Sequence, residues 1–215
     1  MGLVKKTEGG LDALGKLRRQ KEIDEKLKSG ELKSGRGHAE SLVIALDGSA
    51  SMTGAADPQG FVPRGFDYKS KWEAATEATR VLVRASLASS VGLVVFNTGC
   101  KGTVELGARD LLERLSMMGP GGGTDFCVAL EEAIVLLEEG PTRPVRRIIL
   151  LSDGYDGRHS GDTTFERTMF RLEDAGIVVD TVGFGQADEE RLRMIASRTG
   201  GVYRHAKDAH ELVRE

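Results

Sequence analysis

The stretch SLVIALDGSAS, residues 41–51, decides the fold of this chain because it joins a buried strand to a turn rich in side-chain oxygen atoms. Its apolar residues do not alternate with polar ones, which is typical of a parallel strand that is covered on both faces. Asp47 ends the run, and ligand sites in open α/β sheets lie at that end of the strands. The stretch therefore predicts a buried strand that leads into a ligand site.

The same pattern recurs along the chain, since RRIILLSDG at 146–154 also ends in a carboxylate and a glycine. Further strands are predicted at 91–96, 176–184 and 200–206, with a short edge strand at 101–106. Helical spacing occurs at about 71–89, 109–117, 125–139, 163–175, 188–198 and 207–215. This alternation predicts a doubly wound α/β fold: a mainly parallel sheet with helices on both faces and one short antiparallel edge strand.

Residues 1–40 differ from the rest, because many charges surround a thin apolar stripe and a Gly/Ser/Lys-rich segment follows. We predict a charged helical extension and linker over 1–40, and one domain over 41–215. Two interpretations of the extension are open. It is either a solvated helix that lies loosely on the domain or a docking helix for a partner or a second copy.

Composition narrows the classes of partner and compartment. The 215 residues include 30 basic and 33 acidic side chains, with no continuous basic face of the kind that binds nucleic acid. No stretch is apolar enough for a secretory signal or a membrane span. Cys100 and Cys127 are too few for a disulfide framework and lack zinc spacing. We therefore expect a cytoplasmic protein with neither nucleic acid nor membrane as its partner.

Five oxygen-bearing side chains are predicted to converge at one sheet edge: Asp47, Ser49, Ser51, Thr124 and Asp153. The two carboxylates follow strands that are neighbours if the sheet reverses its order between them, and a cation would relieve their repulsion. Thr124 follows a run of glycines that can approach closely. An all-oxygen set suits a hard cation, and a compact octahedron favours Mg²⁺, with Mn²⁺ or Ca²⁺ as substitutes.

These motifs resemble a known site. Asp-Gly-Ser-Ala-Ser at 47–51, Gly-Gly-Thr at 122–124 and Ser-Asp-Gly at 152–154 are similar to the metal-ion-dependent adhesion site (MIDAS) of von Willebrand factor type A (vWA) domains. The resemblance covers about residues 41–215 and implies the Rossmann-like vWA fold. Ser at 152, where many relatives have Thr, is a minor departure.

The resemblance also implies roles for the five residues. Ser49, Ser51 and Thr124 would be inner-shell or switchable ligands, while Asp47 and Asp153 would act directly or through water. Neutral hydroxyl ligands leave much of the cation's charge uncompensated, so an Asp or Glu of a partner protein is the expected further ligand. We therefore expect a protein-binding module and not an enzyme. Cytoplasmic members of the family often work beside AAA+ ATPases, as in chelatase-like complexes, so a subunit of a larger assembly is a further expectation.

Two loops are predicted to flank the site, at 53–72 and 154–163. The first holds residue types common in interface hot spots, namely Phe61, Arg64, Phe66, Tyr68 and Trp72. The alternative is that Phe66 and Trp72 pack inward. The second loop holds Tyr155, Asp156, Arg158, His159 and Asp162. Either it is a solvated rim, or Asp156 or His159 adds a ligand.

A metal-dependent hydrolase of phosphoesters is the enzymatic alternative, with His159 or Asp156 as the base. Three features count against it. Ser49 stands where aspartyl-phosphate hydrolases require a second acid. The glycine run before Thr124 lacks the lysine of a phosphate-binding loop, and no G-x-S-x-G elbow occurs.

Overall fold

The computed structural model describes residues 40–54, 70–86, 90–141, 145–154 and 162–206, which belong to the compact unit spanning residues 39–215. The elements in chain order are β1 (Glu40–Asp47), the 3₁₀ turn η1 (Ala50–Thr53), α2 (Lys71–Ala85), β2 (Ser90–Phe96), β3 (Cys100–Val104), α3 (Leu111–Met117), α4 (Phe126–Glu139), β4 (Val145–Ser152), α5 (Asp162–Asp174), β5 (Val178–Phe184), α6 (Glu189–Thr199) and β6 (Tyr203–Ala206).

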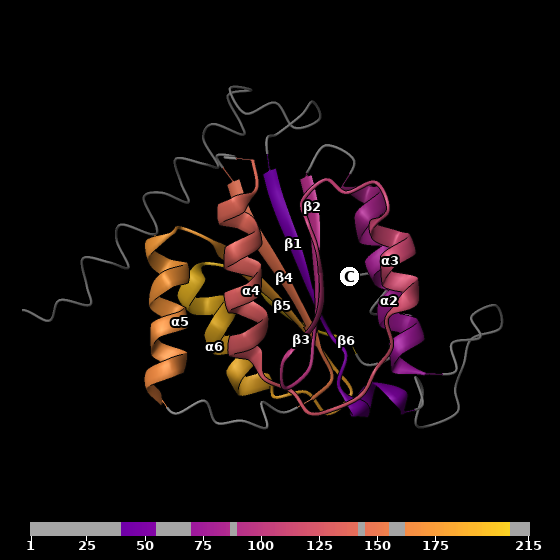
Figure 1. The fold of residues 1–215 in the computed structure, drawn as a ribbon. Helices are drawn as coiled ribbons and strands as arrows, with labels where there is room; N and C mark the ends of the chain where they lie inside the picture. The colour runs from indigo at the N-terminus through magenta and orange to yellow at the C-terminus, as the bar shows by residue number, and fades with distance from the viewer. Residues whose placement is uncertain (1–39, 55–69, 87–89, 142–144, 155–161, 207–215) are drawn as a thin grey trace, which may run out of the picture. The chain divides into compact units, whose positions relative to one another are not determined.

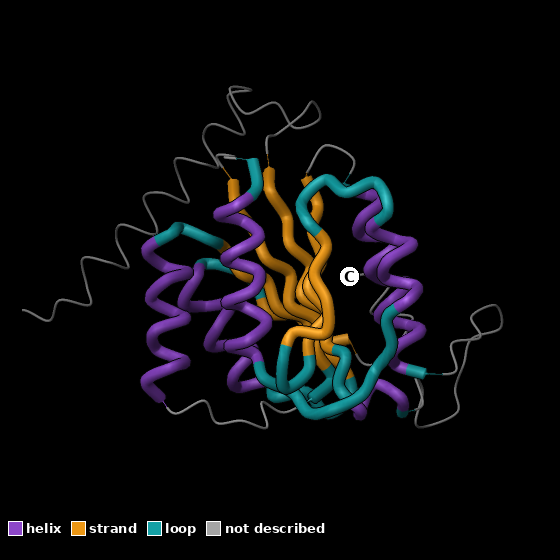
Figure 2. Tube along the Cα trace, in the orientation of Figure 1, coloured by secondary structure: helices purple, strands orange, loops and turns teal. Residues whose placement is uncertain are grey.

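These strands form one sheet in the order β3-β2-β1-β4-β5-β6. Every neighbouring pair is parallel except β2 and β3, which are antiparallel. The predicted doubly wound sheet with one antiparallel edge strand is therefore confirmed. The order changes direction between β1 and β4, and loops that follow the parallel strands gather at one edge of the sheet (Figure 2). This is the switch point at which such folds bind ligands.

Helices cover both faces of the sheet. Figure 1 shows α4, α5 and α6 on one side and α2 and α3 on the other. In β1, Val43 and Ala45 face the first group, whereas Leu42, Ile44 and Leu46 face the second. All five side chains are buried, so the strand needs apolar residues on both faces. This explains the absence of alternation in its sequence.

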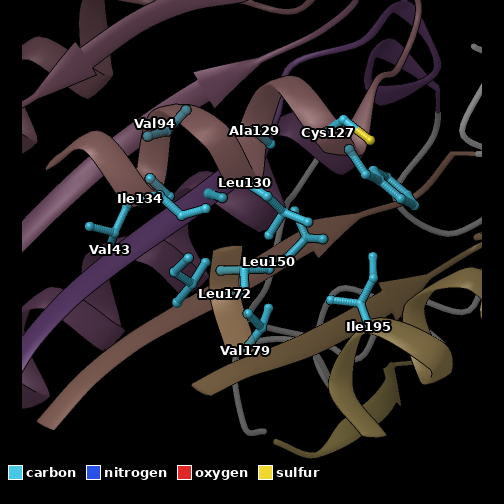
Figure 3. Close-up of a cluster of buried hydrophobic side chains, with 14 of the residues drawn as sticks. Val43, Val94, Cys127, Ala129, Leu130, Ile134, Leu150, Leu172, Val179 and Ile195 are labelled. Carbon is cyan, nitrogen blue, oxygen red and sulfur yellow. The ribbon is translucent and has the colours of Figure 1, made fainter. Parts of the chain in front are cut away.

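The larger cluster of buried side chains lies between the sheet and α4, α5 and α6 (Figure 3). Helix α4 packs on β1 and β2, and the rings of Phe96 and Phe126 meet edge to face with centroids 6.3 Å apart. Asp125 caps this helix, because its carboxylate accepts hydrogen bonds from the backbone N–H groups of Cys127 and Val128. The packing and the cap together fix the start of α4, directly after Thr124.

The predicted helices are confirmed to within a few residues, apart from the end of α2. That helix ends at Ala85, with Ser86 at its C-cap, rather than at residue 89. The predicted extension before Glu40, the helix over 207–215 and most of the two flanking loops lie outside the described residues. No helix among the described residues is both long and apolar enough to cross a membrane. Cys100 is exposed, Cys127 is buried, and neither forms a disulfide.

Candidate metal centre

The turn after β1 carries the first three predicted ligands. Asp47 is fully buried, and its Oδ1 accepts the backbone N–H of Ser49 at 2.8 Å. Ser49 is the N-cap residue of η1, and its hydroxyl oxygen lies 2.8 Å from that of Ser51. The short 3₁₀ turn therefore brings both hydroxyl groups together beside the carboxylate, as the alternating spacing predicts.

Hydrogen bonds join this turn to the end of β4. Ser152 Oγ donates to Asp47 Oδ2 at 2.5 Å, and Ser51 Oγ donates to Asp153 Oδ1 at 2.7 Å. The bonded partners are 105 and 102 residues apart in the chain. They meet because β1 and β4 are paired, with Leu46 opposite Leu151. The predicted neighbourhood of the two carboxylates is therefore confirmed.

The glycine-rich loop before Thr124 lies against the same turn. The backbone N–H of Ala50 donates to the carbonyl of Gly122, and that of Gly121 donates to the carbonyl of Gly48, both at 2.8 Å. Gly122 has φ +87°, a conformation that residues with a Cβ rarely adopt. Glycine therefore allows the close backbone approach that brings Thr124 to the site.

Oxygen atoms from two segments, the turn that follows β1 and the glycine-rich loop, lie around one point beside Gly154. A Cβ placed on Gly154 would lie 2.9 Å from Thr124 Oγ1 and 3.6 Å from both Asp47 Oδ2 and Ser51 Oγ. Thr124 is buried, and its hydroxyl has no hydrogen-bond partner in the described structure. A buried polar group without a partner suggests a missing ligand, and these oxygen atoms fit a small hard cation.

The structure therefore brings all five predicted residues to one site, while their role as ligands stays a prediction. Within the described ranges no three His, Cys, Asp or Glu side chains are grouped so that they could hold a metal ion. Any cation at this site would depend on the hydroxyl groups as well as on Asp47 and Asp153. An all-oxygen donor set of this kind suits hard divalent cations.

The electrostatics of the two carboxylates differ. Removal of Asp47 from water raises its pKa to about 6, and the charge of Asp153 adds to the rise, while hydrogen bonds from Ser152 and Ser49 oppose it. Asp153 instead has a cationic neighbour, because Lys71 Nζ lies 2.6 Å from Asp153 Oδ2. Without a metal ion, the Asp47 carboxylate is therefore buried without a cationic partner among the described residues, whereas the Asp153 carboxylate is paired with Lys71.

Sequence reasoning missed two of these contacts. In the sequence, Ser152 stands out only as a departure from the family pattern, although a hydroxyl next to a carboxylate at the end of a strand is a potential hydrogen-bond donor. Nothing in the sequence indicates Lys71, which is 82 residues from Asp153. Trp72 is half-buried and packs on the cluster beneath α2, which favours the inward alternative for this residue.

The fold and the site together define a class of protein. It is a doubly wound α/β domain with hydroxyl and carboxylate groups at its switch point. The sequence profile of the von Willebrand factor type A domain matches residues 42–155, more than half of the chain. The chain therefore belongs to this family, whose members are protein-interaction modules that bear a site for a divalent metal.

Individual relatives are distant. The chain is 27% identical over 134 residues to calcium-activated chloride channel regulator 1 from Homo sapiens, a match that covers 60% of this chain but only 14% of the relative. A von Willebrand factor type A structure from Catenulispora acidiphila has TM-score 0.66 and 22% identity, covering 82% of this chain and 41% of that one. Proximal thread matrix protein 1 from the mussel byssus, with a zinc-occupied MIDAS motif, has TM-score 0.60 and 20% identity over 83% and 43% of the two chains. These structures share the fold.

Proposed function

We propose that this chain is a metal-dependent protein-binding module in which Mg²⁺ at the MIDAS positions coordinates an acidic side chain of a partner protein. One observation carries the proposal. The buried Thr124 hydroxyl, which lacks a partner in the described structure, faces the same small space as oxygen atoms of Asp47 and Ser51. Asp47, Ser49, Ser51, Thr124 and Asp153 would hold the cation, directly or through water.

The bound cation would supply a concentrated positive charge that attracts a carboxylate. This chain's own residues decide how much of that charge is left. Ser49, Ser51 and Thr124 contribute neutral oxygen atoms. The charge of Asp153 is already offset by Lys71. The protein therefore compensates a divalent ion incompletely, which favours an anionic group from outside.

We infer that the module binds without catalysis. The five proposed ligands include no histidine, and both carboxylates already accept hydrogen bonds that orient them. The hydrolytic alternative needs a base such as Asp156 or His159, both of which lie outside the described residues. We further propose an intracellular adaptor or a subunit of a larger assembly, in keeping with the finding that Cys100 and Cys127 do not form a disulfide.

A peptide-display selection against the whole chain tests the proposed function. We expect peptides enriched in the presence of Mg²⁺ to share an Asp or Glu whose change to Asn or Gln weakens binding about a hundredfold, as does EDTA. The Asp47→Ala variant should enrich no such peptides. Selected peptides that bind equally well in EDTA, and equally well to Asp47→Ala, would show that recognition does not use the metal.

The affinity for Mg²⁺ is expected to fall in acid. A cation binds the ionised form of Asp47, whose pKa in the metal-free protein is about 6. Affinity should therefore be nearly constant above pH 7 and fall by about tenfold per unit well below pH 6. Calorimetric titration with Mg²⁺ between pH 5 and 8 measures this. A constant affinity across the range would show that Asp47 ionisation is not linked to the cation.

A further inference from the structure

A lysine ammonium lies at the candidate metal centre. Lys71 Nζ is 2.6 Å from Asp153 Oδ2, while Ser51 Oγ donates to the other oxygen, Oδ1, at 2.7 Å. The Asp153 side chain is fully buried, whereas that of Lys71 is 18% exposed. The ion pair is thus enclosed on its acidic side and open to solvent on its basic side.

Three segments hold Lys71 in this place. It is the first residue of α2, and its backbone N–H donates to the carbonyl of Gly54, whose own N–H donates to the carbonyl of Ser51. The absence of a side chain at Gly185 leaves room for the ammonium, since a Cβ there would lie 3.1 Å from Nζ. The lysine is therefore anchored to the same turn that supplies the proposed ligands.

We propose that Lys71 is the internal counter-ion of the metal-free centre and competes with the divalent cation for Asp153. This inference rests on the proposed metal site. A buried carboxylate without a counter-charge is costly, so the ammonium stabilises the site when no metal is present. A divalent ion beside Asp153 repels the ammonium, and the flexible lysine stem lets that group move into water.

The competition has a functional consequence. Metal binding must displace part of an existing ion pair, so Lys71 lowers the affinity of the free chain for Mg²⁺. Occupancy of the site by Mg²⁺ then depends more strongly on the carboxylate that a partner supplies. Metal binding and partner binding are thereby coupled. The same lysine lets the domain fold before the metal arrives.

Calorimetric titration of the full chain with Mg²⁺ tests the proposal. We expect Lys71→Met to bind Mg²⁺ about tenfold more tightly than the wild type, and Lys71→Arg, which keeps the charge, to stay close to the wild type. Arg80→Met is the matched control, because it removes one positive charge from the same helix at a residue paired with Glu77. It should leave the affinity unchanged.

Thermal unfolding provides a second measurement. In EDTA, Lys71→Met should unfold at a lower temperature than the wild type, and saturating Mg²⁺ should remove the difference. A deficit that persists in saturating Mg²⁺, or an unchanged or weaker affinity in Lys71→Met, would overturn the competition. Absence of saturable Mg²⁺ binding in both the wild type and Lys71→Met would instead refute the metal site on which the inference rests.

Discussion

Replacing Asp47 with asparagine is expected to remove Mg²⁺ binding and, at the same time, to stabilise the metal-free protein at neutral pH. The amide keeps the shape of the carboxylate and can still accept the N–H of Ser49. It loses the negative charge that a cation requires, so affinity should fall by about a hundredfold or more. Metal affinity falls while stability rises, because the negative charge of Asp47 attracts the cation but destabilises the metal-free fold.

The stability gain follows from the pKa of Asp47. The folded, metal-free protein holds the Asp47 proton more tightly than the unfolded chain, since the pKa rises from 3.8 to about 6. The resulting stability is fully present below pH 4 and is lost as pH rises through about 6. The loss is about 3 kcal/mol by neutral pH in the wild type, and Asp47→Asn does not undergo it.

Denaturant unfolding in EDTA at several pH values measures this difference. Wild type and Asp47→Asn should have similar free energies of unfolding near pH 4 and diverge toward pH 7, where the variant is the more stable. Asp110→Asn is the matched control, because it makes the same change at an exposed acid, the N-cap residue of α3. A neutral-pH stability of Asp47→Asn below that of the wild type, or retained Mg²⁺ affinity, would contradict the expectation.

The fold could be predicted because the pattern of apolar residues within each segment reflects which of its faces are buried. The unbroken apolar runs before Asp47 and Asp153 mark strands that are covered on both faces, and the shared Asp-Gly ending marks the edge where they meet. The structure pairs these strands as neighbours. Patterns of this kind reflect solvent exposure, so each segment can be interpreted from its own sequence without knowledge of its neighbours.

The contacts that tune the site could not be predicted in the same way. The bonds from Ser152 to Asp47 and from Lys71 to Asp153 join segments distant in the chain, and they depend on strand register and on where α2 begins. A lysine at the start of a helix is usually a solvated charge, so the presence of Lys71 in the sequence does not indicate a contact with the site. For Thr124, the run of glycines before it and the family resemblance are the signals in the sequence.

The second large effect is expected from Gly154→Ala, which adds a single methyl group to the site. That carbon would lie 2.9 Å from Thr124 Oγ1 and within 3.6 Å of oxygen atoms of Asp47 and Ser51. It would occupy the space proposed for the cation and replace a polar surface by an apolar one. We expect Mg²⁺ affinity to fall by about a hundredfold and stability by about 1–3 kcal/mol, because the Thr124 side chain must move.

Gly99→Ala is the matched control, since a Cβ at Gly99 would meet no atom within 4 Å. Both variants should give the circular dichroism spectrum of the wild type, and only Gly154→Ala should lose Mg²⁺ in calorimetric titration. Adding a methyl group removes no proposed ligand and no charge, so a loss of affinity would show that the space beside Gly154 must stay open for Mg²⁺ to bind. Wild-type affinity in Gly154→Ala would mean that the oxygen atoms around Gly154 do not enclose the ion, and the ligand set would then have to be assigned to a different space.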